Sequence, residues 1–205
     1  MDLFTQTGSP EDALAALRAE VLADRSWPTA KLATQAVFGE GPIGADLMFI
    51  GEQPGDEEDI AGRPFVGPAG RLFNQMLERA GIERDKVYVT NAVKHFKFTP
   101  TGRRRIHQSP DAGDIAHYRP FLKREMEIVR PKLLVTLGAT ALRAVMGKAM
   151  PVTKVRGEVM VTPEGEPLFP TVHPSYLLRL PDPESKEREY ARFLDDLKRA
   201  GREVH

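Results

Sequence analysis

The chain has 205 residues, 41% of them hydrophobic, which is enough for one globular domain with its own core. Lys plus Arg and Asp plus Glu both number 29, so the overall charge indicates no polyanionic partner, and a surface for one has to come from local clustering. The chain has no cysteine, which excludes disulfides and thiolate-ligated metal sites, including the usual ligation of iron–sulfur clusters.

The sequence also shows no targeting or membrane signal. No apolar run approaches the roughly 20 residues of a membrane-spanning helix. The N-terminus lacks the basic and then apolar pattern of a secretory signal. We therefore expect a soluble cytoplasmic protein without a membrane partner, monomeric and folded as a single domain over residues 1–205.

The first half of the chain alternates helix and strand signals. Ser9, followed by a proline and two acidic residues, is typical of a capped helix start, and Leu14 and Leu17 begin a helical spacing of apolar residues. An irregular stretch at 24–32 holds the single tryptophan, Trp27. After it the patterns predict a buried strand at 46–50, a Gly- and Pro-rich segment at 63–70, a helix at 71–80 and a strand at 87–90.

The second half begins with a basic segment at 94–111 that has little sign of regular structure. The patterns then predict a helix at 113–130, a buried strand at 132–137, a short helix at 139–146 and a charged amphipathic helix at 183–199. Two further strands are predicted at 159–162 and 168–171. Either they pair with each other through a turn, or the strand at 168–171 joins the main sheet alone. Strands that alternate with helices predict an α/β fold, a three-layer α/β/α sandwich with a mainly parallel sheet.

Polar side chains follow several of the predicted strands. The motif Gly51-Glu52-Gln53-Pro54-Gly55-Asp56 follows the first strand, Asn91 ends the second, and His173 follows the strand at 168–171. The first motif and Asn91 are also compatible with ordinary turns, since Gly, Pro, Asp and Asn are common turn residues, and His173 alone is compatible with a surface or core histidine. Ligands of such sheets bind outside the carboxyl ends of the strands, so these groups together predict a binding site there.

These elements carry five motifs of a known family. The motifs, as they stand here, are Gly51-Glu52-Gln53-Pro54-Gly55-Asp56-Glu57-Glu58-Asp59, Arg63-Pro64-Phe65-Val66-Gly67-Pro68-Ala69-Gly70-Arg71-Leu72, Tyr88-Val89-Thr90-Asn91-Ala92-Val93-Lys94-His95-Phe96-Lys97, Arg104-Arg105-Ile106-His107 and His173-Pro174-Ser175. Over residues 33–179 the chain resembles the uracil-DNA glycosylase superfamily, most closely family 4 and, through the Arg-Arg-Ile-His motif, its UdgX branch. The resemblance implies a uracil-DNA glycosylase fold and an enzyme of DNA repair. In the UdgX branch such an enzyme excises uracil and stays covalently joined to the abasic site through the loop histidine, here His107.

The resemblance assigns the uracil pocket to Phe65, Asn91 and Gly51. A base everted from the stack loses a few kcal/mol, and stacking on an aromatic ring such as that of Phe65 returns roughly 1 to 3 kcal/mol. The carboxamide of Asn91 offers one donor and one acceptor, which match the N3 and O4 atoms of uracil and mismatch cytosine. Without its motif, Phe65 would more commonly be a core residue, as most phenylalanines are.

Two histidines are expected to act on the glycosidic bond. Negative charge develops on the departing uracil, and His173 is expected to donate a hydrogen bond to its O2 atom. A neutral imidazole is a good nucleophile near neutral pH, and His107 is expected to attack the sugar C1′. Glu52 is expected to take a proton from His107, with Gln53 and Asp56 positioning the loop or a water. An alternative for His107 is a contact to phosphate.

The expected partner is uracil-containing DNA, preferentially single-stranded, with free uracil as a product and association with the bacterial nucleoid. Basic side chains neutralise phosphates and position the strand without selecting the base. A basic run is also compatible with a solvated loop. The residues expected to contact DNA are Arg103, Arg104, Arg105, Lys94, Lys97, Ser175 and Arg179.

The chain departs from the family at the iron–sulfur cluster that family 4 and typical UdgX proteins carry. The motifs place Asp24, Trp27, His95 and Tyr118 at or near the four ligand positions. We therefore expect no cluster, no other metal and no cofactor, and we expect Trp27 and Tyr118 to pack into the vacated volume.

The sequence is compatible with three functions. The first is a single-turnover glycosylase that crosslinks itself to DNA through His107. The second is a multiple-turnover uracil-DNA glycosylase in which His107 contacts phosphate. The third is a catalytically silent binder of uracil-containing or abasic DNA.

Overall fold

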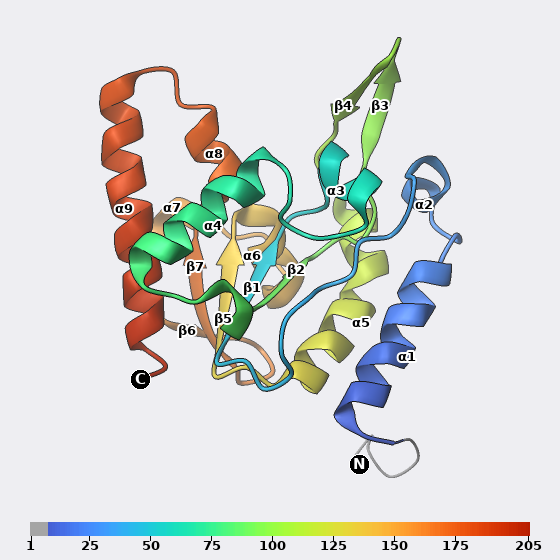
Figure 1. Ribbon diagram of the computed structural model, residues 1–205, viewed down its shortest axis with the longest axis horizontal. Coiled ribbons are helices and arrows are strands. Elements are labelled where there is room, and N and C mark those ends of the chain that lie inside the picture. The colour runs from blue at the N-terminus through green and yellow to red at the C-terminus, as the bar shows by residue number, and fades with distance from the viewer. Residues whose placement is uncertain (1–7) are drawn as a thin grey trace.

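The computed structural model describes residues 8–205, and its centre is a twisted sheet (Figure 1). In this part of the chain the sheet has five strands in the order β2-β1-β5-β7-β6. Their bounds are β1 (Leu47–Gly51), β2 (Tyr88–Asn91), β5 (Leu133–Leu137), β6 (Met160–Val161) and β7 (Pro167–Thr171). The first four in spatial order are parallel, and β6 is an antiparallel edge strand. The parallel strands therefore end at one edge of the sheet.

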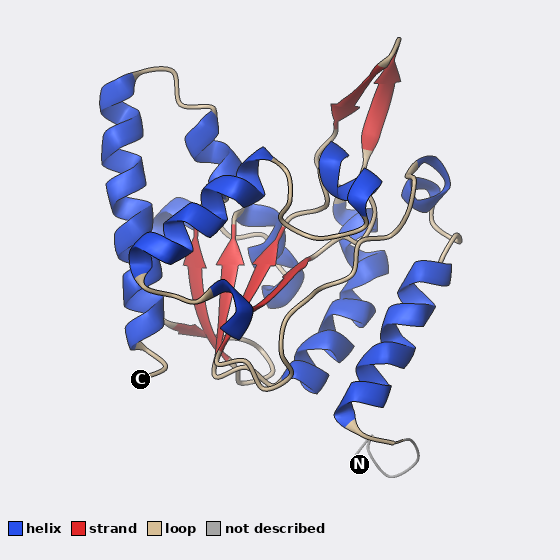
Figure 2. Cartoon of the chain, in the orientation of Figure 1, coloured by secondary structure: helices blue, strands red, loops and turns tan. Residues whose placement is uncertain are grey.

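Helices cover both faces of this sheet (Figure 2). One face carries α4 (Pro68–Ala80), α8 (Pro174–Leu178) and α9 (Pro183–Arg202), and the other carries α5 (Ala112–Val129) and α6 (Ala139–Met146), with α1 (Pro10–Ala23) packed outside α5. Shorter helices are α2 (Pro28–Leu32), α3 (Asp56–Ala61), α7 (Val152–Val155) and a 3-10 turn at Arg84–Lys86. The predicted three-layer α/β/α fold with a mainly parallel sheet is confirmed.

Alternating residues of β1 show how the sheet joins two cores. Phe49 points toward α4 and meets the ring of Phe73 at 5.0 Å, edge to face. Its neighbours Met48 and Ile50 point the other way, into the core beneath α5 and α6. Because successive strand residues face opposite sides, a strand buried on both faces is apolar throughout. The continuous apolar run of β1 therefore fixes it in the middle of the sandwich.

Several predicted elements agree closely with the structure. The predicted helix at 139–146 has the bounds of α6, and Ser9 caps α1 by accepting a hydrogen bond from the Asp12 amide at 3.2 Å. The first alternative for the late strands is confirmed, because β6 and β7 pair with each other, and β7 also pairs with β5, so it does not join the main sheet alone. None of the helices in residues 8–205 has the length and hydropathy of a membrane span.

The basic segment was predicted wrongly as irregular. It forms an antiparallel hairpin, β3 (Phe98–Thr101) and β4 (Arg104–His107), which projects beyond the sandwich (Figure 1). Gly102, at φ +61°, supplies the left-handed turn between the strands. Neither strand buries one full face, so the alternation that marks a strand in sequence is missing.

Candidate active site

A cleft of about 880 Å³ opens at the edge of the sheet where the parallel strands end. The loops after β1, β5 and β7, the last residue of β2 and the end of the hairpin all contribute to it. The predicted site residues in its wall are Glu52, Gln53, Asp56, Phe65, Asn91, His107, Ser175, His173 and Arg179. Residues that lie far apart in sequence thus share one cavity, as the strand-end argument predicts.

Phe65 forms an aromatic wall of the cleft in an unusual backbone conformation. Its φ is +57°, a left-handed value that side chains other than glycine rarely adopt, and its ring packs against Phe73 with centroids 5.0 Å apart. Gly70 allows the turn, because a Cβ there would lie 2.2 Å from the Phe65 carbonyl. This backbone conformation places the Phe65 ring at the cleft. Backbone outliers of this kind often occur at functional sites.

Asn91 lies beside this ring with its carboxamide at the cleft. The side chain makes no hydrogen bond to any residue in 8–205, although the residue is only 4% exposed. Gly51, on the adjacent strand, makes room for it, since a Cβ there would lie 2.4 Å from the Asn91 Oδ1 atom and 3.0 Å from the Phe65 ring. A nearly buried amide without a partner is available to a planar polar ligand stacked on Phe65.

Glu58 holds the two loops around this pocket, and the sequence analysis missed it. Its carboxylate accepts hydrogen bonds from the amides of Gly67 at 2.8 Å and Gly55 at 3.1 Å. These amides begin α4 and α3, so one buried carboxylate satisfies two helix starts. The only signal in the sequence is an acidic residue three positions after Gly55.

His107 and Glu52 meet at the mouth of the cleft. His107 Nε2 lies 3.2 Å from Glu52 Oε1, and the imidazole is about half exposed. The second carboxylate oxygen, Oε2, accepts a hydrogen bond from Thr140 at 2.6 Å. Burial alone would raise the pKa of Glu52, but the hydrogen bonds from His107 and Thr140 outweigh burial and hold the pKa below its ordinary value. Glu52 is therefore an ionised acceptor facing a histidine.

The hairpin that carries His107 is anchored by Arg105. Its guanidinium pairs with Asp56 at 2.5 Å and also with the fully buried carboxylate of Asp59. It also lies over the rings of Phe96 and Phe98, 5.4 and 5.2 Å from their centroids. Asp56 therefore contacts the hairpin through Arg105, and the Arg105 guanidinium is engaged with carboxylates rather than presented on an open basic surface.

Gln53 secures the base of the same hairpin. Its amide donates to the carbonyl of Gln108 at 2.9 Å, and its oxygen accepts the Lys97 amide hydrogen at 3.1 Å. Because these two backbone positions flank the hairpin, Gln53 ties both strand ends to the loop that carries Glu52. The loop-positioning role expected of Gln53 fits this geometry.

The basic residues expected to contact DNA separate into two groups. Lys94 is a correction: it is fully buried, and its ammonium pairs with Glu125 at 2.5 Å, because a buried charge needs a partner. Lys97 pairs with Asp111 and Asp114 at 2.7 and 2.5 Å. Both ammonium groups are therefore engaged with carboxylates of the fold.

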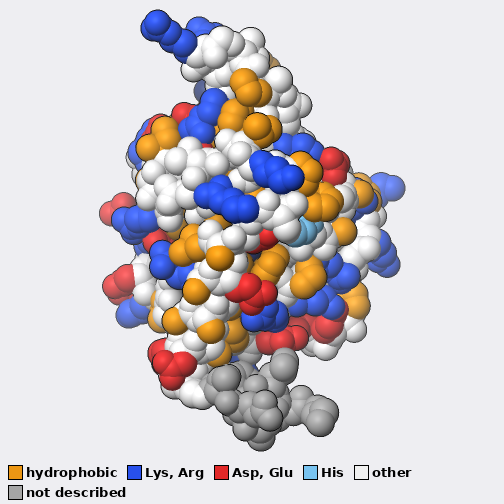
Figure 3. Space-filling view, turned by 90° about the vertical axis from the view of Figure 1, so that its right-hand side faces the viewer, with side chains coloured by type: hydrophobic (Ala, Val, Ile, Leu, Met, Phe, Trp, Pro, Cys, Tyr) orange, Lys and Arg blue, Asp and Glu red, His pale blue; other side chains and the backbone are white. Residues whose placement is uncertain are grey.

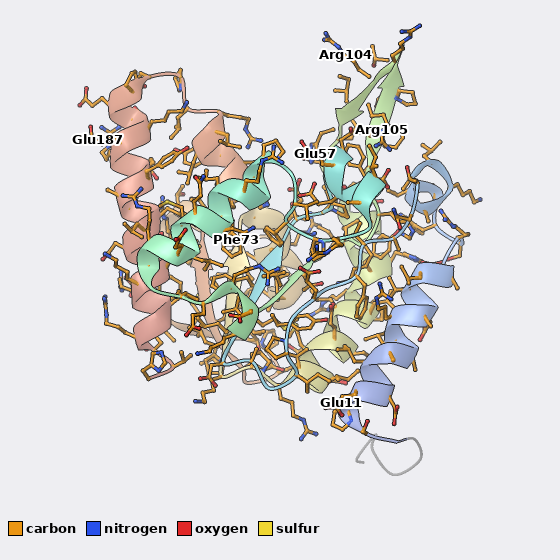
Figure 4. All side chains as sticks on the ribbon, in the orientation of Figure 1. Glu11, Glu57, Phe73, Arg104, Arg105 and Glu187 are labelled. Atoms are coloured by element: carbon orange, nitrogen blue, oxygen red, sulfur yellow. The ribbon has the colours of Figure 1, made fainter. Side chains whose placement is uncertain are left out.

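Arg103 and Arg104 belong to the second group, which faces solvent. Both are exposed at the turn of the hairpin, and Arg104 points away from the body (Figure 4). The blue tip of the projection in Figure 3 is formed by such Lys and Arg side chains. Ser175 and Arg179 lie at the opposite wall of the cleft, with Arg179 Nη1 3.4 Å from Ser175 Oγ. Positive charge thus flanks the cleft on two sides.

His173 caps α8 and faces Glu52 across the cleft. Its Nδ1 atom accepts the Ser175 amide hydrogen at 3.1 Å, which leaves the ring proton on Nε2. Burial lowers the pKa of His173 to about 4, against the opposing influence of Glu52. At neutral pH the residue is therefore an uncharged hydrogen-bond donor.

Asp24, Trp27 and Tyr118 contact His117, and His95 contacts Tyr118. His117 Nε2 lies 2.7 Å from Asp24 Oδ2, and its ring stacks on Trp27 and meets the edge of Tyr118, both with centroids 4.7 Å apart. The Tyr118 hydroxyl pairs with His95 Nδ1 at 2.8 Å. Trp27 and Tyr118 thus both pack on the His117 ring.

These side chains do not fit an iron–sulfur cluster. The chain has no thiolate, and the indole of Trp27 donates to Asp114 at 2.7 Å, so the polar groups are engaged with one another. Burial lowers the pKa of His95 to about 4, and its Nε2 atom is buried without a partner. No group of three or more His, Asp or Glu residues within 8–205 is arranged to hold a metal ion.

The fold and cleft define an α/β/α protein with a polar ligand site at the ends of its parallel strands. The family model described as the uracil DNA glycosylase superfamily matches residues 38–198. The chain is 41% identical over 169 residues to the type-4 uracil-DNA glycosylase of Thermotoga maritima, covering 82% of each chain. It is 38% identical over 179 residues to that of Sulfurisphaera tokodaii, covering 83% of this chain and 78% of the relative. The chain belongs to the uracil-DNA glycosylase superfamily.

Proposed function

We propose that this protein is a uracil-DNA glycosylase of the UdgX type, which excises uracil and then remains bonded to the abasic site through His107. The observation that carries the proposal is the 3.2 Å approach of His107 Nε2 to Glu52 Oε1 at the mouth of the cleft. The similarity to type-4 uracil-DNA glycosylases supports the substrate. The whole chain acts in this proposal as one domain and one copy.

Base selection is assigned to Phe65 and Asn91. The everted base stacks on the Phe65 ring, and the unpaired carboxamide of Asn91 reads its N3 and O4 atoms with two hydrogen bonds. Cytosine presents the opposite donor and acceptor pattern, which leaves the buried amide unpaired at a cost of about 1 to 3 kcal/mol. Single-stranded DNA is the preferred substrate, because eversion from a single strand disrupts no base pair.

Bond cleavage is assigned to His173. As the bond between C1′ and N1 breaks, its electron pair moves to the uracil ring, and positive charge is left on the sugar. The Nε2–H of neutral His173 donates to O2, where the anionic charge gathers. This hydrogen bond strengthens as charge develops and therefore favours the transition state over the substrate.

The covalent step uses the ring nitrogen of His107 that faces away from Glu52. With its proton on Nε2 toward Glu52, the lone pair of Nδ1 forms the new bond to C1′. The ring would then carry a positive charge, and Glu52 removes it by accepting the Nε2 proton. That proton passes to solvent, and the uracil anion takes one up, so atoms and charge balance. The neutral alkylated imidazole is a poor leaving group, which makes the adduct stable.

One gel experiment separates this proposal from its two rivals. The protein is mixed with uracil-containing single-stranded DNA, boiled in detergent and resolved under denaturing conditions. A shifted band that accumulates to no more than one DNA per protein supports the crosslinking glycosylase. Free abasic product in excess of protein identifies a multiple-turnover enzyme, and unchanged DNA identifies a silent binder. Either of the last two results contradicts the proposal.

Replacing Glu52 with glutamine should slow adduct formation by about 10²- to 10⁴-fold, the usual contribution of a positioned proton acceptor. The amide of Glu52→Gln keeps the size of the side chain but cannot take the His107 proton. The measurement is the rate of band-shift formation with protein in excess over DNA. Glu187→Gln, at an exposed position of α9, is the matched control and should leave the rate unchanged. Crosslinking of Glu52→Gln at the parental rate would remove Glu52 from the mechanism.

A further inference from the structure

Thr140 contacts the reactive pair from behind the cleft. It is the second residue of α6, and its hydroxyl donates to Glu52 Oε2 at 2.6 Å, while Oε1 of the same carboxylate faces His107 at 3.2 Å. Thr140 is not part of the cleft wall, in contrast to Glu52 and His107. The hydroxyl therefore reaches the reacting groups only through Glu52.

We propose that Thr140 is a positioning residue that holds the Glu52 carboxylate with Oε1 turned toward His107. This inference rests on the proposed function of the His107 and Glu52 pair. The terminal torsion of a glutamate side chain has broad rotational preferences, so a single contact at Oε1 leaves the plane of the carboxylate poorly defined. A second hydrogen bond at Oε2 fixes that plane.

The surroundings of Glu52 indicate why a hydroxyl suits this position. The ionisable groups that face the carboxylate are His107 on the hairpin and His173 before α8, with Arg179 beside His173. A threonine hydroxyl adds a hydrogen bond without adding a charge or a competing proton acceptor. The bond also favours the ionised carboxylate, which is the form that accepts the His107 proton. At the first turn of α6 the helix dipole acts in the same direction.

The test compares Thr140→Val, which keeps the shape and loses the donor, with Thr140→Ser, which keeps the donor. Valine and threonine have similar helix propensities, so α6 should be preserved. Crosslinking rates are measured with protein in excess from about pH 4 to 8, a range that spans the ordinary pKa of a glutamate. We expect Thr140→Val to crosslink about tenfold more slowly at neutral pH, the loss expected from one hydrogen bond to a charged group. Thr140→Ser should retain the parental rate.

The pH profile separates positioning from a general structural effect. Because His107 must also be neutral to react, the acid limb of the rate does not report Glu52 alone, and the pKa of Glu52 is read instead from the pH dependence of its ¹³C carboxyl signal. Loss of the Thr140 hydrogen bond raises that pKa, so the carboxyl titration of Thr140→Val should move up by about one pH unit, while that of Thr140→Ser stays in place. Equal rates and equal carboxyl titrations in Thr140→Val and the parent would overturn the inference, as would a Thr140→Ser variant as slow as Thr140→Val. A parent protein that forms no adduct would instead overturn the proposed function, and this inference with it.

Discussion

Replacing His107 with alanine should abolish the covalent adduct while uracil release continues. The variant lacks the imidazole that bonds to C1′, so no shifted band should form on a denaturing gel. Phe65, Asn91 and His173 remain, and they still bind the base and stabilise its anion. Water then captures the sugar cation, and the product is free abasic DNA, detected by alkali cleavage. The protein would change from single to multiple turnover.

His205 provides the matched control for that experiment. It is an exposed histidine at the C-terminal end of the chain and lies outside the cleft wall. His205→Ala should crosslink as the parent does. A His107→Ala protein that still gave a full shifted band would show that another side chain is the nucleophile.

Replacing His173 with alanine should slow uracil release by about 10²- to 10³-fold, as the removal of one oxyanion-stabilising donor does elsewhere. The measurement is the single-turnover release of uracil, which does not depend on the later bond to His107. The change removes the neutral Nε2–H donor and also the acceptor for the Ser175 amide. Adduct formation should slow by the same factor, because it requires the base to leave first.

The pH dependence gives a second test of His173. Burial lowers its pKa to about 4, so it stays neutral from pH 5 to 8 and gains charge only on further acidification. The pH–rate profile of uracil release should therefore have no step near the ordinary histidine pKa of about 6.5 that is present in the parent and absent in His173→Ala. A titration of that kind, or a loss of less than about tenfold in the variant, would contradict a neutral donor at this position.

The sandwich was predictable because its signals are local. The strands β1 and β5 are buried on both faces, so each is a largely apolar run in the sequence. The hairpin β3–β4 was not predictable in the same way. It is held by Arg105 through Asp56 and Asp59, which lie 49 and 46 residues earlier in the chain. The periodicity of neighbouring residues in the sequence does not indicate contacts between residues so far apart.

The site was predictable where motifs place residues at strand ends. Asn91 and His173 fall at the ends of their strands as expected and share one cleft with Phe65. Lys94 misled the prediction, because basic residues are usually exposed, whereas this ammonium is buried and its ionic partner, Glu125, lies 31 residues away. Thr140 was missed for a similar reason, since it meets Glu52 across 88 residues.

The contacts around His117 were also hard to predict, because they join residues far apart in the sequence. The resemblance led to the prediction that Trp27 and Tyr118 pack into the volume of the family's cluster, and in the structure both rings pack on His117. It did not indicate that His117 would pair with Asp24, 93 residues away. The contacts of Asp24 and Trp27 with Asp114 and His117 join the segment between α1 and α2 to α5.

The most direct test of this account is the intact mass of the boiled protein–DNA product, followed by mapping of the modified peptide. A mass equal to protein plus oligonucleotide minus uracil, with the sugar on the peptide that contains His107, is the expected result. Unmodified protein beside free abasic DNA, or a sugar attached to any other residue, would contradict it.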